Sequence, residues 1–146
     1  MNSTYLSDED YDFIYSRVPR ICADILFVNP KGHVLMTKRT IEPYIDYWHL
    51  PGGRLKFSES VEDALKRVAK AEIGVDLTGE QNLVGYCEYP DEVQKEQPRH
   101  SISLVHIYEV DDDIEISSGD KYQWCSEMPG LVIPPIKDFL IKYKFL

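Results

Sequence analysis

The segment from residue 51 to residue 75, PGGRLKFSESVEDALKRVAKAEIGV, combines a glycine turn with a helix-forming pattern. The two glycines after Pro51 free the backbone from the constraints of a Cβ atom, so this turn can approach a ligand closely. Ser60 and Asp63 form a capping-box pattern, which predicts that a helix begins between them. Gly74 follows Ile73 and predicts a left-handed cap at the end of that helix. The segment therefore predicts a ligand-binding turn followed at once by a helix.

One carboxylate interrupts the apolar pattern of this helix. Val61, Leu65 and Val68 recur at helical spacing and predict a buried face. Glu72 lies seven positions after Leu65, so two turns place it on the apolar side at the helix end. A buried charge without a partner is costly. The pattern alone leaves two interpretations open: Glu72 pairs with a nearby arginine or turns to solvent, or it holds a ligand.

The same segment resembles the signature of the Nudix hydrolases, Gly-x5-Glu-x7-Arg-Glu-U-x-Glu-Glu-x-Gly-U, in which U is aliphatic. The residues that match its spacing are Gly53, Glu59, Arg67, Glu72, Gly74 and Val75. Two positions depart from it, because Val68 replaces a glutamate and Ala71 replaces the first glutamate of a pair. In that family the loop and helix bind divalent metal at a nucleoside diphosphate derivative. The resemblance implies a similar site with fewer carboxylates.

The two departures are similar to those of the GDP-mannose mannosyl hydrolases within that family. Further matches to this group are Asp24, Lys38-Arg39-Thr40, Tyr47-Trp48 and Arg54. The group carries a Gln-His pair shortly before a Tyr-x-Trp, supplying a metal ligand and a general base. Here Ser118-Gly119 occupies the matching positions before Tyr122-Gln-Trp124. The resemblance implies a nucleoside diphosphate sugar of the GDP-mannose or GDP-glucose type as substrate, and it leaves the base unassigned.

Roles for the ligand-binding residues follow from this resemblance. Gly52, through its carbonyl, and Glu72 would hold Mg²⁺ or Mn²⁺. Asp24 would contact the nucleotide or the departing group. Arg39 and Arg54 would bind phosphate and stabilise the leaving group, since guanidinium groups suit bidentate contacts to phosphate oxygens. Asp24, Arg39 and Arg54 would therefore be both catalytic and substrate-binding residues.

The resemblance also implies a supporting pair, Glu59 and Arg67, which would hold the geometry of the loop and helix. For the general base we predict His100, because it begins a strand beside an acidic segment and titrates near neutral pH. Asp120 and the carboxylates of residues 91–96 are the alternatives. His100 as a strand-end residue that only packs is an equally open interpretation. His49, beside the glycine turn, is interpreted as structural or solvated.

Composition restricts the class of protein. The chain has 146 residues, 43% of them hydrophobic and 28% charged, which predicts one domain over residues 1–146. Its net charge of −9 argues against nucleic acid or an anionic membrane surface as the main partner. No apolar run is long enough to span a membrane. Three scattered cysteines, Cys22, Cys87 and Cys125, predict reduced, buried thiols in a cytoplasmic protein.

The order of predicted elements is helix, strands, helix, strands, helix, an α+β pattern. We expect helices at 6–15, at 61–73 and from 134 onward, and strands at 21–28, 33–37, 82–89, 101–110 and 119–126. Residues 90–99 are expected to form a charged loop. The resemblance implies an α/β/α sandwich around a mixed sheet and a homodimer.

Three functions remain open on the sequence. The first is a metal-dependent hydrolase of a nucleotide sugar, in which water attacks the anomeric carbon and releases GDP and sugar. The second is attack at phosphorus, which cleaves the pyrophosphate of a nucleoside diphosphate derivative. The third is a Nudix-fold nucleotide-binding protein without catalysis, favoured by the missing carboxylates and the missing Gln-His pair.

Overall fold

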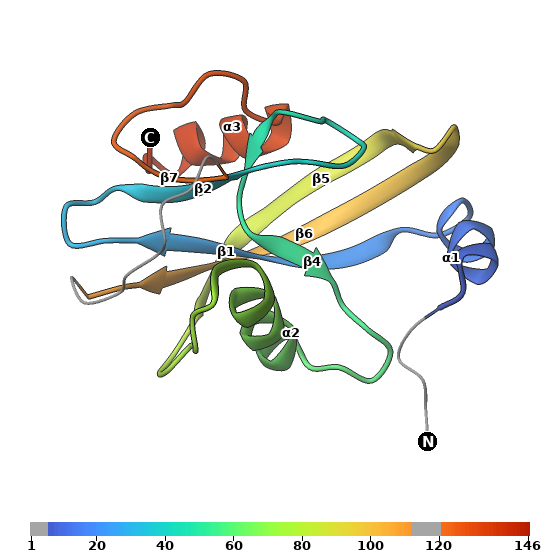
Figure 1. Ribbon diagram of the computed structural model, residues 1–146, viewed down its shortest axis with the longest axis horizontal. Coiled ribbons are helices and arrows are strands. Elements are labelled where there is room, and N and C mark those ends of the chain that lie inside the picture. The colour runs from blue at the N-terminus through green and yellow to red at the C-terminus, as the bar shows by residue number, and fades with distance from the viewer. Residues whose placement is uncertain (1–5, 112–120) are drawn as a thin grey trace.

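The computed structural model describes residues 6–111 and 121–146. Its helices are α1 (Asp8–Tyr15), α2 (Val61–Val68), the π-helical turn η1 (Ala69–Ile73) and α3 (Pro134–Lys142). Its strands are β1 (Arg20–Val28), β2 (Val34–Lys38), β3 (Trp48–His49), β4 (Gly52–Arg54), β5 (Asn82–Gln94), β6 (Gln97–Glu109) and β7 (Tyr122–Cys125). Figure 1 shows the sheet in the middle, with α3 on one face and α2 on the other. The expected α/β/α sandwich is confirmed.

The sheet is mixed, and β1 lies at its centre. β1 runs parallel to β6 from Arg20 beside Ser101 to Val28 beside Glu109, and β6 pairs antiparallel with β5. On its other edge β1 pairs with β4 at one end and with β2 only at Val28 and Val34. β2 pairs with β3 and β7. The edge of β1 is thus shared between two strands that diverge from each other.

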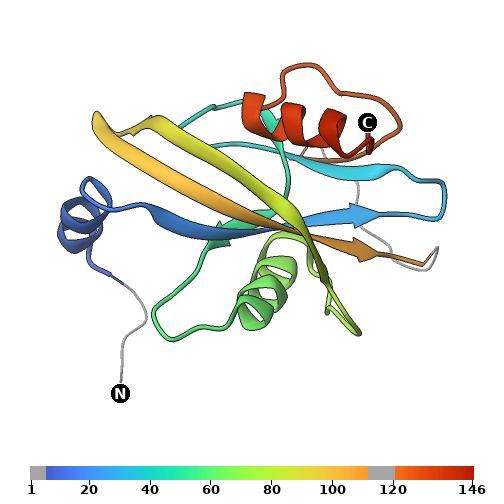
Figure 2. The same ribbon diagram turned by 180° about the vertical axis from the view of Figure 1, so that it is seen from behind.

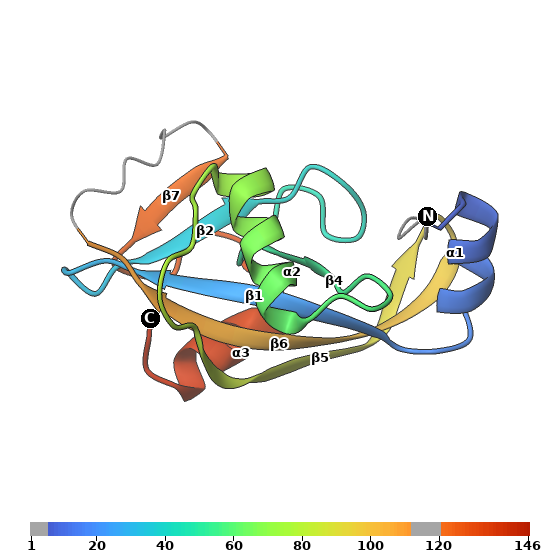
Figure 3. The ribbon, with the colours of Figure 1, turned by 90° about the horizontal axis from the view of Figure 1, so that it is seen from below.

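Alternate residues of β1 face two separate cores. Ala23, Ile25 and Phe27 pack toward α2, together with Leu65 and Val68. Leu26 packs on the opposite face, in a second cluster whose other members include Leu50, Val105, Ile133, Ile136, Phe139 and Leu140. Figure 3 shows α2 lying across its face of the sheet. Since Asp24 shares the face of Leu26, the alternation directs this carboxylate toward the α3 side.

The helix start predicted at Ser60 and the left-handed cap predicted at Gly74 are confirmed, and Ser7 caps the first helix in the same way as Ser60. Ser7 accepts a hydrogen bond from the Asp10 amide at the start of α1, and Ser60 accepts one from Asp63 at the start of α2. Gly74 ends η1 in the left-handed conformation, with a φ of 78°. The last turn differs from the expected α-helix, because Ala69–Ile73 is π-helical. Such turns insert an extra residue and often mark functional sites.

The expected loop at 90–99 is wrong. β5 and β6 form a long hairpin that pairs Glu92 with Arg99 and Gln94 with Gln97. Only Lys95 and Glu96 make the turn, with φ values of 49° and 63°. A two-residue turn with both central φ angles positive matches the twist of a hairpin. Charge and proline in this stretch therefore belong to an extended ribbon, which reaches α1 in Figure 2.

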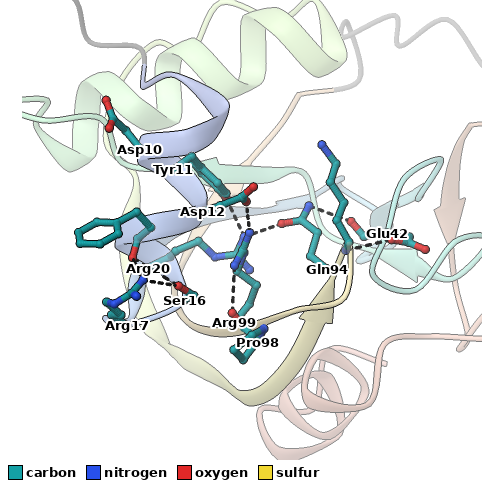
Figure 4. Close-up of polar contacts among 12 residues, drawn as sticks. Asp10, Tyr11, Asp12, Ser16, Arg17, Arg20, Glu42, Gln94, Pro98 and Arg99 are labelled. Carbon is teal, nitrogen blue, oxygen red and sulfur yellow. Dashed lines mark hydrogen bonds and ion pairs between the residues drawn. The ribbon is translucent and has the colours of Figure 1, made fainter.

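None of the residues of helix α1 is buried, and polar contacts attach the helix to β6 of this ribbon and to β1. Asp12 forms an ion pair with Arg99, whose side chain is 1% exposed. The Tyr11 hydroxyl accepts a hydrogen bond of 2.7 Å from Arg20. Figure 4 shows these contacts grouped between α1 and the hairpin. The helix therefore extends the wall that the hairpin forms beside β1.

In the parts of the chain that the structure describes, no helix is long and apolar enough to cross a bilayer. All three cysteines are free thiols. Cys87 and Cys125 are buried as expected, whereas Cys22 is only partly buried. It differs because its side chain faces a cavity rather than a core.

Candidate active site

The divergence of β2 and β4 from β1 brings Gly52 against Asp24. The two residues are paired across β1 and β4. A Cβ atom at residue 52 would lie 1.8 Å from the Asp24 Oδ1 atom, so only glycine fits there. The Pro51-Gly-Gly turn is therefore required by a carboxylate that packs directly on its backbone.

Glu72 reaches the same glycine from the opposite face of the sheet. It lies in η1, and the Gly52 backbone hydrogen-bonds to its carboxylate. Burial raises the pKa of Glu72 to about 7, an effect that this hydrogen bond and Arg39 partly offset. The Tyr122 hydroxyl donates a hydrogen bond to the Glu72 carbonyl and fixes the turn. The structure therefore favours the interpretation that Glu72 faces a site rather than solvent.

Asp24 is the second carboxylate of this cluster and is 7% exposed. Its pKa is raised to about 7, first by burial and further by the negative charges of Glu72 and Glu92. A hydrogen bond from Ser103 and the charge of Arg39 act in the other direction. Asp24, Gly52 and Glu72 thus form one cluster, which the sequence resemblance had grouped without showing their contact.

Two cavities meet at Gly52. The first has a volume of about 230 Å³ and extends from Asp24 along β1 and the hairpin to Tyr11 of α1. The second has a volume of about 380 Å³ and is lined by residues that include Glu72, Lys121 and Tyr122. The residues that line both are Arg39, Ile41, His49 and Gly52. A ligand with two unlike ends joined by a diphosphate suits this arrangement.

Arg39 lies at the junction of the two cavities. Its Nε atom donates to the Pro43 carbonyl at 2.6 Å and its Nη2 atom to the Glu42 carbonyl at 3.1 Å. Partial burial lowers the pKa of Arg39, and the nearby carboxylates Glu92 and Glu72 oppose that shift. The carbonyls of residues 42 and 43 therefore hold the Arg39 guanidinium near the Asp24 and Glu72 carboxylates.

Arg54 lies on the wall of the first cavity, at the end of β4. Its guanidinium lies 5.7 Å from the ring centre of Tyr11 and 5.5 Å from that of Tyr15. It donates to the Leu55 carbonyl at 3.0 Å. Arg54 is therefore anchored against α1, a contact that the sequence did not indicate.

Glu59 and Arg67 form the supporting pair that the sequence predicted. Arg67 donates to both carboxylate oxygens of Glu59, at 2.8 and 2.9 Å. It also donates to the Arg54 carbonyl at 2.9 Å, and the Lys56 amide donates to Glu59. The hydrogen bonds from Arg67 lower the pKa of Glu59. Together these contacts fasten the glycine turn to α2.

The structure does not bring His100 into either cavity. Its neighbours in β6, Ser101 and Ser103, both line the first cavity, so strand alternation directs His100 to the other face. Ser118-Gly119 and Asp120 lie outside the described residues. Of the predicted alternatives in residues 91–96, Glu92 lines the first cavity.

His49 was interpreted as structural or solvated, but it lines both cavities. Its pKa is lowered to about 3, first by burial and then by the charge of Arg39, so the ring is neutral at physiological pH. A signal was present in the sequence: Leu50 belongs to the core, and alternation sends His49 the opposite way. Ser101 and Ser103 gave a similar signal, as two hydroxyls at alternate positions of an apolar strand.

The donor atoms around Gly52 fit a hard divalent cation. Within residues 6–111 and 121–146, no three His, Cys, Asp or Glu side chains gather at metal-binding spacing. Mg²⁺ is usually held by one or two carboxylates, with substrate phosphates and water completing its coordination. The Glu72 carboxylate and the Gly52 carbonyl, oxygen donors from two residues that line the same cavity, match that requirement. Mg²⁺ or Mn²⁺ would therefore be shared between the protein and a phosphate-bearing ligand.

Comparisons with known proteins find relatives of this chain and solved structures with the same fold. The glycan biosynthesis protein Agl8 of Haloferax volcanii is 32% identical over 113 residues, 76% of this chain and 72% of that protein. An ADP-ribose pyrophosphatase of Methanocaldococcus jannaschii is 32% identical over 103 residues, 70% of this chain and 57% of that protein. The MutT protein of Methanosarcina mazei has the same fold, with a TM-score of 0.70 and 22% identity over 88% of this chain and 95% of that one.

A family model described as the NUDIX domain matches residues 18–131. This range includes β1, β4 and η1, the elements that carry Asp24, Gly52 and Glu72. The protein belongs to the Nudix family.

Proposed function

We propose that the protein hydrolyses a nucleoside diphosphate sugar of the GDP-mannose or GDP-glucose type in a reaction that requires a divalent cation. The observation that carries the proposal is the Asp24–Gly52–Glu72 cluster at the junction of two cavities. A diphosphate at the junction directs its two substituents into different cavities. Family membership supports the coarser function, hydrolysis of a nucleoside diphosphate derivative.

Two observations favour a sugar substrate. Val68 and Ala71 stand where the family signature has glutamates, as in the mannosyl hydrolases. The Haloferax relative is named for glycan biosynthesis.

In the proposed reaction the oxygen of water bonds to the anomeric carbon while the bond from that carbon to the β-phosphate oxygen breaks. The products are the free sugar and the nucleoside diphosphate, and one proton of the attacking water is released. A bound Mg²⁺ supplies positive charge for the departing diphosphate. Arg39 adds a fixed guanidinium at the junction, where negative charge develops on the leaving group. Glu72 and the Gly52 carbonyl would hold the cation, with Asp24 beside the bond that breaks.

Attack at phosphorus is the second candidate. It is favoured by the relative named an ADP-ribose pyrophosphatase, which is equally identical over a similar length. In that reaction the oxygen of water bonds to one phosphorus while the bond from that phosphorus to the bridging oxygen breaks, and the products are two phosphate esters and a proton. The same cluster would serve it, because both reactions place a diphosphate beside Glu72.

The test is turnover of a panel of nucleoside diphosphate sugars with Mg²⁺ in ¹⁸O-labelled water. We expect a free sugar and a nucleoside diphosphate, with the label in the sugar. Label in a phosphate product would replace the first candidate by the second. Binding of these nucleotides without turnover of any of them would establish a non-catalytic nucleotide-binding protein and contradict both.

A further inference from the structure

The end of the first cavity remote from Gly52 is lined by polar side chains that the proposed reaction does not use. They come from three elements: Arg20 from β1, Glu92 and Gln94 from β5, and Ser101 from β6. Arg20 is 8% exposed, and in its ion pair with Glu92 each side chain is 10% exposed. Burying such groups is costly unless they find hydrogen-bonding partners.

Arg20 already has protein partners around its guanidinium. Its Nε atom donates to Ser101 at 3.0 Å, and its Nη1 atom donates to Tyr11 at 2.7 Å and to Gln94 at 3.3 Å. Gln94 is fixed in turn, because its amide donates to the Glu42 carbonyl at 3.2 Å. Figure 4 shows Gln94 between the arginine and Glu42. The Arg20 guanidinium therefore forms part of the cavity wall, and its hydrogen bonds to protein side chains make it unsuited to bind an anion.

Glu92 is supplied with fewer hydrogen-bonding partners than Arg20. Ser101 directs its hydroxyl at the Glu92 carboxylate, while the closest Arg20 nitrogen lies 3.6 Å away, beyond an ordinary hydrogen bond. A carboxylate has about four sites that accept hydrogen bonds. Burial raises the pKa of Glu92, in agreement with a carboxylate poorly supplied with donors. Glu92 thus retains acceptor capacity toward the cavity.

The chemistry of the occupant follows from these groups. Arg20, the guanidinium at this end of the cavity, already donates to Ser101, Tyr11 and Gln94, so an anionic group here would be repelled by the Glu92 carboxylate without that guanidinium being available to offset the repulsion. An apolar group would displace water from the Glu92 carboxylate without replacing its hydrogen bonds. Hydroxyl groups donate to carboxylates and satisfy them. A volume of about 230 Å³ also suits one part of a substrate rather than a whole nucleotide.

We propose that this end of the cavity binds the sugar of the substrate, with Glu92 accepting hydrogen bonds from its hydroxyl groups. The inference rests on the proposed function, which places the diphosphate at Gly52. It assigns the nucleoside to the second cavity, on the side of Lys121 and Tyr122. Glu92 is then a residue that determines specificity for a hydroxyl-rich substituent.

The first experiment compares two ligands by calorimetry in the presence of Mg²⁺. One is GDP, and the other is a GDP-mannose analogue in which methylene replaces the anomeric oxygen, so that it is not turned over. Glu92→Gln keeps the shape of the side chain and removes its charge. We expect it to weaken binding of the analogue by about 10- to 100-fold, the range for a hydrogen bond to a charged group, and to leave GDP binding unchanged.

The matched control is Glu88→Gln, which lies on the same strand but is exposed and outside this cavity. It is expected to bind both ligands as the unmodified protein does. Equal loss of both ligands by Glu92→Gln, with an unchanged Tm, would place the nucleoside in this cavity and overturn the proposal. Unchanged binding of both would also overturn it. Absence of GDP and analogue binding to the unmodified protein would contradict the proposed function itself.

The main measurement of a second experiment uses the unmodified protein, so its result does not depend on whether a variant folds. Analogues that lack one sugar hydroxyl each are titrated into the unmodified protein. We expect at least one deletion to weaken binding by about 10-fold or more, because it leaves a buried carboxylate without its donor. Affinity that is independent of every hydroxyl would overturn the proposal. In Glu92→Gln the same hydroxyl deletion is expected to weaken binding little further, because the effects of removing two groups that contact each other are not additive.

Discussion

At the scale of single residues, the site depends on Glu72, a carboxylate that approaches the glycine turn from the face of the sheet that α2 covers. Glu72→Gln is expected to lower kcat by about 100-fold or more, since it removes charge at the place where the cation is proposed to bind. The Tm is expected to stay the same or rise, because the raised pKa of Glu72 shows that its charge is unfavourable in the fold. Steady-state rates and thermal melts measure both effects. Full turnover by this variant would remove Glu72 from the site.

Arg39 and Arg54 are both expected to promote catalysis, and Arg54 is also expected to hold α1 in place. Arg39→Ala and Arg54→Ala should each cost about 2–4 kcal/mol of transition-state stabilisation, the range for losing a donor aimed at developing charge. Arg54→Ala should also loosen α1, because Tyr11 and Tyr15 pack on that guanidinium. The ratio of kcat/KM values gives the first quantity, and proteolysis within α1 gives the second. A fully active variant would refute the phosphate role of that arginine.

The histidine predicted as the base is expected to be dispensable. His100→Gln should keep the rate and its pH profile, because strand alternation directs the side chain away from the cavity that Ser101 and Ser103 line. The measurement is kcat/KM across the neutral pH range. A large loss of rate with an intact fold would show that the ring reaches the substrate in the complex.

At the scale of elements, α2 and the glycine turn act as one unit because Arg67 joins them. Arg67→Met is expected to lower the free energy of unfolding at pH 7 by about 2 kcal/mol, the range for hydrogen bonds between charged groups. The pKa of Glu59 is lowered in the folded protein from its ordinary value of 4.5, so its contribution is present above that value and is lost as pH falls through the lowered one. Urea unfolding at several pH values should therefore show the difference between variant and parent shrinking below about pH 4. A difference that is constant with pH would mean that packing, and not the ion pair, joins the two elements.

At the scale of the whole molecule, metal and fold are expected to be separable. Two hydrophobic clusters on opposite faces of the sheet hold the protein together, and neither includes the Asp24 or Glu72 carboxylates. Chelation of divalent cations should therefore abolish hydrolysis while leaving the Tm almost unchanged, and added Mg²⁺ should restore the activity. Turnover that survives exhaustive chelation would contradict the proposed role of the cation.

The sequence by itself determined the part of the site that is built from neighbouring residues in the chain. The glycine turn and both ends of the following helix depend on residues close together in the chain, whose spacing predicts their contacts, and the pairing of Glu59 with Arg67 was implied by the resemblance to the Nudix signature. The resemblance to a known signature extended this to Asp24, Arg39 and Arg54. The π-helical turn around Glu72 was not predictable, because its residues are ordinary helix formers and tertiary contacts select that geometry.

Only the tertiary structure decided the other half. The first cavity exists because β1 runs parallel to β6, which places Arg20 beside Ser101, and because the hairpin stays paired as far as residue 94. Glu92 has no distinctive spacing from the glycine turn in the sequence, and the alternation that turns His49 away from the core does not show which cavities it lines. Their positions follow from strand pairing between distant segments, and a shift of one residue in that register would turn each side chain to the opposite face. The sequence thus specified where the diphosphate is expected to bind, and the register of the sheet specified what surrounds it.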